Sequence, residues 1–431
     1  ENGASLKYSL DFAQNIWKER PEMSMESVFS LEDEYTGEKI GSKLERIREV
    51  MKENGCNAHV LSSLDDIAWL LNIRGNDIAY CPLVLSYAIV YNNSVELFAD
   101  IRKFSDDIIN LLAENQVKIY PYEDIYRKVS EMTSEDKLLL DSSIMNYSLY
   151  QAISKETVIV DKQNPEILMK SVKNETQAEN LRKAHLKDAV AHTKFMYWLK
   201  KNIGRVEITE LSASARLEGL RAEQEHFLGP SFGPISAYGE HGAIVHYSAD
   251  EKSNVPLKEG KLFMTDTGGH YLEGSTDITR TVALGEVGNI EKEHFTLVAR
   301  AMLRLANTVF LYGCSGANLD CISREVFWKE GLNFNHGTGH GVGYLLNIHE
   351  GPINFRWKEG ERPAPALEEN MVITDEPGIY IEGSHGIRLE NELLVRKTVK
   401  NEYGQFMNFE ILTYVPIDLD AILPEKMSTE E

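Results

Sequence analysis

The stretch MTDTGGHYLEGSTDITRTV, residues 264–282, constrains the fold of this chain more than any other. Two runs rich in β-branched residues flank a glycine-containing turn, which predicts a hairpin, yet each run carries an aspartate, Asp266 and Asp277. Aspartate is depleted in strands. Two inward carboxylates repel each other, and burying an ion without a partner costs several kcal/mol. We therefore expect positive charge between these two side chains.

A second stretch, ENMVITDEPGIYIEGSHGIRLENELLV (369–395), follows the same plan. A predicted strand, MVIT, leads to Glu376, and a second predicted strand carries Glu390. Alternation along that strand puts Ile387 and Leu389 on one face and Arg388 with Glu390 on the other. Each predicted hairpin thus presents two carboxylates, and the two stretches form a weak internal repeat in plan but not in letters.

Between the two hairpins lies NHGTGHGVGYLLNIHEGP (335–352). The run HGTGHGVG lacks the Lys-Ser/Thr ending of a phosphate-binding loop, and its glycines disfavour a helix by about 1 kcal/mol each. In an extended chain His336 and His340 would share a face and stand about 13 Å apart. We expect one of them to bind a metal ion and the other to line the pocket.

Two aspartates, two glutamates and one histidine carry four negative charges, which two divalent cations neutralise. Carboxylate-rich sites with a single imidazole favour hard ions such as Mn²⁺, with Co²⁺ or Zn²⁺ as alternatives. Two such ions about 3.5–4 Å apart hold a bridging hydroxide and polarise a carbonyl group. The pattern therefore predicts a dinuclear hydrolase.

Composition excludes several classes of partner. The formal charge of −22 repels phosphate backbones and anionic lipids. The longest apolar run, YCPLVLSYAIVY (80–91), is shorter than the roughly 20 residues of a membrane span. Four cysteines without CxxC spacing indicate reduced thiols. We expect a cytoplasmic protein that binds neither nucleic acid nor membranes.

At 431 residues the chain is long enough for two or more domains. Helical and strand-like segments alternate over 38–163, which predicts an α/β domain, and 11 of the 12 histidines follow residue 184, in the second part at 164–424. That part opens with a predicted helix beginning at Asn174, whose buried face includes His185 and His192. We expect these two to be packed, hydrogen-bonded histidines of a helix interface.

At these residues the sequence resembles the pita-bread metallopeptidases, and in detail the Xaa-Pro aminopeptidases (aminopeptidase P). The stretches that carry the resemblance are GAIVHYSA, TDTGGHYLEGSTDITRTV, HGTGHGVGYLLNIHEGP, DEPGIY, GIRLENELLV and, upstream, SLDDIAWLLNIRGNDIAYCPLVLSYAIV. The resemblance covers about 38–420 and implies an α+β fold, with an α/β creatinase-like, non-catalytic domain at 38–163 and a pita-bread catalytic domain at 164–424. It further implies that 1–37 is the linker remnant of a missing N-terminal domain, that 425–431 starts a truncated C-terminal extension, and that the full-length protein forms a homodimer.

The resemblance also implies site residues and an activity, removal of the N-terminal residue of peptides with proline in second position. The implied metal ligands are Asp266, Asp277, His340, Glu376 and Glu390. Glu376 would also act as the general base, and His246 and His349 would stabilise the developing oxyanion. The implied substrate-binding residues are His246, His336, His349 and Arg388.

We expect His246 to lie in a strand formed by GAIVHYS. Two alternative functions are a prolidase-type Xaa-Pro dipeptidase and a non-catalytic pita-bread module that binds peptides. The latter would be marked by loss of ligands, and all five implied ligands are present.

Overall fold

The computed structural model describes residues 12–358, 360, 363–429 and 431. The chain divides into two compact units, Glu1–Lys170 and Ser171–Glu431, which are described separately. Among the described residues, no helix is both long and apolar enough to cross a membrane. The short helix α1 (Phe12–Ile16) lies in the region predicted to be a linker, and residues 1–11 of that region lie outside the described residues.

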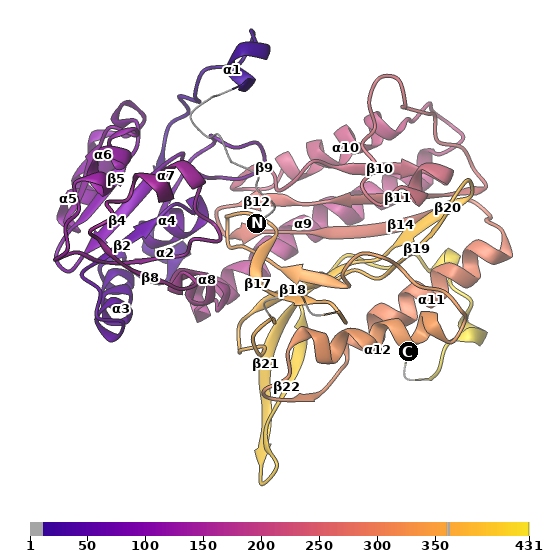
Figure 1. The fold of residues 1–431 in the computed structure, drawn as a ribbon. Coiled ribbons are helices and arrows are strands. Elements are labelled where there is room, and N and C mark those ends of the chain that lie inside the picture. Colours follow the sequence, from indigo (N-terminus) through magenta and orange to yellow (C-terminus); the bar gives the residue numbers. More distant parts are fainter. Residues whose placement is uncertain (1–11, 359, 361–362, 430) are drawn as a thin grey trace, which may run out of the picture. The chain divides into compact units, whose positions relative to one another are not determined.

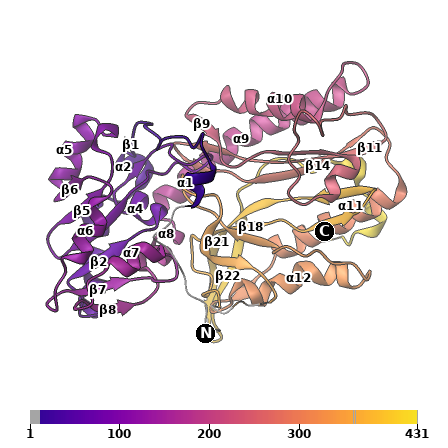
Figure 2. The same ribbon diagram turned by 45° about the horizontal axis from the view of Figure 1, so that its top comes forward.

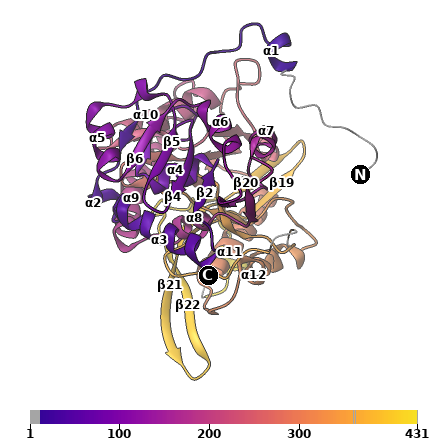
Figure 3. The same cartoon turned by 60° about the vertical axis from the view of Figure 1, so that its left-hand side comes forward.

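A mixed six-stranded sheet forms the centre of the first unit, in the order β6-β5-β4-β2-β7-β8 (Figure 3). Its strands are β2 (Ala58–Leu61), β4 (Tyr87–Tyr91), β5 (Val95–Phe98), β6 (Val117–Tyr120), β7 (Lys137–Leu140) and β8 (Val158–Asp161). The helices of the unit are α2 (Asp33–Thr36), α3 (Ile40–Glu53), α4 (Leu64–Leu70), α5 (Asp106–Glu114), α6 (Asp124–Ser130), α7 (Tyr147–Ala152) and, at its end, α8 (Pro165–Ser171). Two short strands, β1 (Phe29–Ser30) and β3 (Ile73–Arg74), pair with each other.

The order of helices and strands in this unit agrees with the alternation predicted from the sequence. The predicted helix KLERIREVMKENG corresponds to α3, and the apolar run that follows Pro82 contains β4, which pairs antiparallel with β5. Side chains from both helices and strands, such as Ile125, Leu138 and Leu149, are fully buried in one core. The unit is therefore an α/β domain with its own core.

The second unit contains four long helices and several small sheets. The helices are α9 (Glu175–Asn202), α10 (Glu210–Ala222), α11 (Asn289–Ala306) and α12 (Gly316–Trp328). The strands are β9 (Phe227–Pro230), β10 (Ile235–Tyr238), β11 (Lys261–Thr267), β12 (Gly269–Tyr271), β13 (Gly274–Ser275), β14 (Ile278–Leu284), β15 (Phe310–Leu311), β16 (Gly339–Gly341), β17 (Glu350–Phe355), β18 (Val372–Asp375), β19 (Gly378–Ile381), β20 (His385–Arg388), β21 (Asn391–Asn401) and β22 (Gly404–Ile411). Asn174 caps α9 in a capping box with Gln177, which explains why the helix begins where the sequence predicted.

The antiparallel sheet β10-β11-β14 has apolar side chains on both faces. Phe263 and Val282 face α9 and α10 in one core, and the neighbouring residues Leu262 and Ala283 face α11 and the β19–β20 hairpin in another. Figures 1 and 2 show α9 and α10 together along one side of β11 and β14. Asp266 lies in β11 and Asp277 immediately precedes β14, so this buried sheet carries both aspartates of the opening stretch.

A second antiparallel sheet has the order β15-β22-β21-β18-β16-β17, and its long β21–β22 hairpin extends away from the rest of the unit (Figure 1). Arg280, in β14, joins the two sheets: its guanidinium donates to the carbonyl oxygen of Glu390 and to the side-chain oxygen of Asn391, at the start of β21. Because Arg280 is fully buried, this connection holds the acidic ends of both sheets beside each other.

Candidate metal centre

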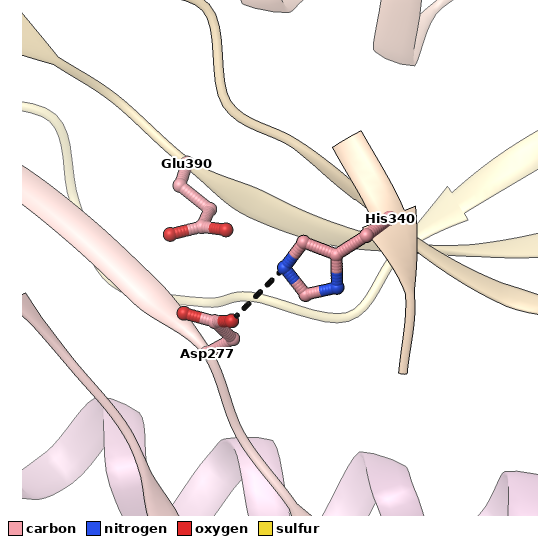
Figure 4. A group of neighbouring side chains, drawn as sticks. All are labelled: Asp277, His340 and Glu390. Carbon is pink, nitrogen blue, oxygen red and sulfur yellow. Dashed lines mark ion pairs between the residues drawn. The ribbon is translucent and has the colours of Figure 1, made fainter. Parts of the chain in front are cut away.

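Asp277, His340 and Glu390 converge from three separate places in the chain. Asp277 immediately precedes β14, His340 is the middle residue of β16, and Glu390 lies between β20 and β21. One ligand atom of each lies within 4.8 Å of the other two. Figure 4 shows the two carboxylates and the imidazole pointing toward one another. A carboxylate, a carboxylate and an imidazole at this spacing form a donor set that fits a divalent cation.

The hydrogen bond of His340 leaves one ring nitrogen available to a metal ion. Nδ1 lies 2.9 Å from the carbonyl oxygen of Gly341, an acceptor, so Nδ1 carries the proton. The unprotonated Nε2 then faces the acids, 3.4 Å from Oδ2 of Asp277 and 3.8 Å from Oε1 of Glu376. This is the tautomer that a metal ligand requires.

The two glutamates are held by neighbouring threonines. Thr279 donates its hydroxyl proton to Oε2 of Glu390 at 2.7 Å, and Thr374 donates to Oε1 of Glu376 at 3.3 Å. The backbone N–H of Glu376 also donates to the carbonyl oxygen of Thr338 at 2.8 Å. Each carboxylate is therefore oriented by the strand next to it.

Asp266 lies in β11 and is outside the three-residue group, but its carboxylate faces the same acids. Oδ2 accepts a hydrogen bond from Nη2 of Arg388 at 2.5 Å. Oδ1 is buried and has no hydrogen-bond partner within the described part of the chain. An orphaned carboxylate oxygen beside other carboxylates fits a cation ligand.

The electrostatics of the cluster indicate uncompensated negative charge. Burial, reinforced by neighbouring carboxylates, raises the pKa of Asp277 and of Glu390 well above their usual values. Burial also raises the pKa of Glu376, against the opposing effects of His340 and Arg388. Divalent cations at this point would restore the ionised forms, so the residues present fit the metal ions that the sequence predicted.

The predicted substrate-side residues surround this cluster at different depths. His336 contacts the phenol oxygen of Tyr380 through Nε2 at 2.8 Å, and Arg388 donates to the same oxygen at 2.8 Å. The ring of His349 lies 4.4 Å from that of His340, centroid to centroid. His246 is exposed.

Two local predictions were wrong. The GAIVHYS segment is not a strand, because the chain turns through a short 3₁₀ helix at Gly239–Ala243, opened by Gly239 with φ 57°, and His246 follows in a turn. The HGTGHGVG run is extended only at Gly339–Gly341, and its first residue, His336, lies in a bend. Tyr380 is not among the site residues predicted from the sequence, although it stands in the DEPGIY motif.

Comparisons with known proteins agree with this architecture. Residues 19–177 match the Creatinase/Prolidase N-terminal domain, and residues 179–397 match metallopeptidase family M24. Xaa-Pro aminopeptidase 1 of Dictyostelium discoideum is 36% identical over 419 residues, which cover 96% of this chain and 66% of that protein. Aminopeptidase P1 of Arabidopsis thaliana is 33% identical over 481 residues, covering 100% of this chain and 74% of that protein.

Among solved structures, the crystal structure of an X-prolyl aminopeptidase from Caenorhabditis elegans, described as a cytosolic enzyme with a di-nuclear active site, has a TM-score of 0.91 at 34% identity. The alignment covers 97% of this chain and 69% of that one. The chain thus spans about two thirds to three quarters of the length of these relatives. The predicted fold class, a creatinase-type domain followed by a pita-bread domain, is confirmed. The chain belongs to metallopeptidase family M24, among the homologues of the Xaa-Pro aminopeptidases.

Proposed function

We propose that this chain is a metal-dependent aminopeptidase that hydrolyses the N-terminal Xaa-Pro bond of peptides. The observation that carries the proposal is the convergence of Asp277, His340 and Glu390 in a buried, acid-rich centre. The names of its relatives in Dictyostelium and Arabidopsis support the same activity. A peptide-binding module without catalysis has no need of this donor set.

Two divalent metal ions are proposed for the centre, with Mn²⁺ as the preferred ion. Asp266, Asp277, His340, Glu376 and Glu390 would hold them, with Oδ1 of Asp266 and Nε2 of His340 as the atoms left available. The C. elegans relative is described as dinuclear, which supports the count. The choice of Mn²⁺ rests on four carboxylates against one imidazole. When bound, such ions supply Lewis acidity and lower the pKa of water.

Glu376 is proposed to move the proton in the reaction. Its Oε1 accepts a hydrogen bond from Thr374 and lies 3.8 Å from Nε2 of His340. In that position its carboxylate takes a proton from the attacking water and returns it to the proline nitrogen as the peptide bond breaks.

Three histidines are proposed to contact the substrate carbonyl region. Burial lowers the pKa of His336 to about 3 and that of His349 to about 4, so both rings are neutral at pH 7. The neutral ring of His349 can donate a hydrogen bond without adding positive charge next to cations. Both ring nitrogens of His336 already have partners, the carbonyl oxygen of Gly337 at 2.7 Å and the phenol oxygen of Tyr380 at 2.8 Å, so His336 would act together with Tyr380. His246 is exposed and would approach the peptide from solvent.

Proline at the second position requires a site that does not use the amide proton, because the Xaa-Pro bond has none. Arg388 is proposed to assist substrate binding from behind the centre, through its contacts with Tyr380 and Asp266. The free amine of the peptide carries positive charge, and the acid cluster favours its presence. Peptides with a free N-terminus are therefore the proposed substrates.

The resemblance to a cytosolic relative supports a cytoplasmic location, which is proposed here. A homodimer stays a prediction of the sequence resemblance.

The proposal is tested by removing and restoring the metal. The chain is treated with a chelator, dialysed, and assayed on an Xaa-Pro-Yaa tripeptide before and after addition of Mn²⁺. We expect activity to disappear with the chelator and to return with the metal, whereas Glu376→Gln stays inactive under both conditions. A chelated chain of verified metal content near zero that still cleaves the peptide would contradict the metal-dependent mechanism.

A further inference from the structure

One face of α9 carries three ionisable side chains that are completely buried. His185, Asp188 and His192 are each 0% exposed. The sequence predicted packed, hydrogen-bonded histidines here. Both are packed, but neither ring has an aligned hydrogen-bond partner within the described residues. The two histidines nevertheless contact different groups. His192 contacts the core, and His185 contacts a residue that is bonded to the proposed metal centre.

His192 has apolar and aromatic surroundings. Its ring lies 6.2 Å from that of Phe195, centroid to centroid, in an edge-on arrangement. Burial, with the charges of Arg221 and Arg280, lowers the pKa of His192 well below its usual value. His192 is therefore a neutral packing residue of the core.

His185 instead faces a carboxylate. Its Nε2 lies 3.1 Å from Oε2 of Glu392, an ion-pair distance without the alignment of a hydrogen bond, and both side chains are 0% exposed. The other oxygen of Glu392 accepts a hydrogen bond from the backbone N–H of Asp277 at 2.7 Å. His185 is thus linked through one side chain to the backbone of a proposed metal ligand.

Asp188, one turn further along α9, makes a parallel connection. It accepts hydrogen bonds from the hydroxyl of Thr276 and, at 2.7 Å, from Nε of Arg221. Arg221 in turn donates to the carbonyl oxygen of Thr267 at 3.2 Å. Thr276 precedes Asp277, and Thr267 follows Asp266. The same face of α9 therefore reaches the chain beside both aspartates of the centre.

A purely structural explanation does not account for Glu392. Glu392 is buried and repels the neighbouring carboxylate of Asp277, a cost that an apolar side chain on the strand would not carry. Within the described residues, the side chain of Glu392 accepts one aligned hydrogen bond, from the backbone N–H of Asp277. This bond fixes the backbone from which the carboxylate of Asp277 projects. Groups that orient metal ligands in this way change metal affinity by about 10- to 100-fold when removed.

We propose that the His185–Glu392 pair is a positioning device for Asp277 and that it sets how tightly the centre holds its metal ions. Glu392 fixes the backbone of Asp277, and His185 holds Glu392 in place from α9. The inference rests on the proposed metal centre and adds to it two residues that touch neither metal nor substrate.

The test measures binding of Mn²⁺ alone to the chelated chain by isothermal titration calorimetry, so that no activity is needed. Glu392→Val removes both oxygens, and we expect Mn²⁺ affinity to fall by roughly 10- to 100-fold. Glu392→Gln keeps an acceptor for the N–H of Asp277, and we expect it to stay within about threefold of the unchanged chain.

His185→Leu and His192→Leu make a matched pair, since both replace a buried histidine on the same helix. We expect His185→Leu to lower Mn²⁺ affinity by at least about fivefold and His192→Leu to leave it within about twofold. Thermal unfolding of the metal-free variants shows whether each is folded. If Glu392→Val does not fold, this pair and Glu392→Gln decide the question.

Equal affinities for the two leucine variants, whether both unchanged or both reduced, would overturn the positioning role while leaving the metal centre intact. An unchanged affinity in folded Glu392→Val would do the same. An unaltered chain that binds no Mn²⁺ would overturn both the inference and the proposed function.

Discussion

Nη2 of Arg388 lies 2.5 Å from Oδ2 of Asp266, and both side chains are buried. The arginine therefore occupies one oxygen of a proposed metal ligand and leaves the other, Oδ1, buried without a hydrogen-bond partner among the described residues. Because the guanidinium already offsets part of the charge of Asp266, this carboxylate depends less on a metal ion than Asp277 does.

Asp266→Asn keeps the size of the side chain but removes its charge and one ligand oxygen. We expect the chain to fold and to retain less than its full complement of metal, because the three-residue group of Asp277, His340 and Glu390 is unchanged. Elemental analysis of metal per chain after loading with Mn²⁺ and desalting checks this. Full occupancy in the variant would exclude Asp266 as a ligand.

Glu376→Gln removes the proposed base, while the amide oxygen can still accept a hydrogen bond from Thr374. We expect turnover of an Xaa-Pro-Yaa peptide to fall by roughly 10²–10⁴-fold, the usual scale for loss of acid–base catalysis. Metal content is measured on the same sample, so that lost chemistry is distinguished from lost metal. A variant that keeps more than half of the activity would remove Glu376 from the mechanism.

His192 predicts a pH dependence of stability. The folded chain keeps this ring neutral, since burial holds its pKa well below 6.5, whereas the unfolded chain binds a proton near pH 6.5. Below about pH 6.5 the unfolded state therefore takes up a proton that the folded state does not, and this part of the stability is progressively lost as the pH falls.

In His192→Leu this loss is absent. Between about pH 7.5 and 5.5 we expect the free energy of unfolding of the unchanged chain to decrease by about 1.4 kcal/mol more than that of the variant. Urea unfolding of the two metal-free proteins at each pH measures the difference. Parallel curves would show that folding leaves the pKa of His192 close to its unfolded value, and would contradict the buried neutral ring.

The sequence predicted those features of the site that depend on local alternation. In GIRLE, Ile387 and Leu389 lie in the core between α11 and the β19–β20 hairpin, and Arg388 points the other way, to Asp266. The acids of the two stretches come from short runs whose pattern is visible in the letters, although β18 pairs with β16 and β21 and does not form the predicted hairpin with β20. The match to metallopeptidase family M24 covers residues 179–397, which include both of these stretches.

Features that depend on distant parts of the chain could not be predicted. The bond from Arg388 to Asp266 joins residues 122 positions apart, and the bond from Asp277 to Glu392 joins residues 115 positions apart. The sequence predicts a strand over GAIVHYS, but tertiary contacts determine the local conformation. The chain turns there instead, through the 3₁₀ helix that begins at Gly239.

The free N-terminus is a further prediction about substrates. The positive amine of a peptide is favoured by the acid cluster, and acetylation removes that charge. We expect an N-acetylated Xaa-Pro-Yaa peptide to be cleaved at least about 10²-fold more slowly than its free counterpart, since a lost buried charge contact of about 3 kcal/mol has that effect. Equal rates would mean that the acids do not bind the amine, and cleavage of Xaa-Pro dipeptides alone would point to a prolidase-type dipeptidase.

The most direct test of the proposed function compares two tripeptides that differ only in the second residue, Xaa-Pro-Yaa and Xaa-Ala-Yaa, in the Mn²⁺-loaded chain. The measurement is kcat/KM for release of the first residue, with Glu376→Gln as the blank. We predict cleavage of the proline peptide and little or no cleavage of the alanine peptide. Comparable kcat/KM values for the two would contradict the proline-specific aminopeptidase, even if the metal centre binds its ions as described.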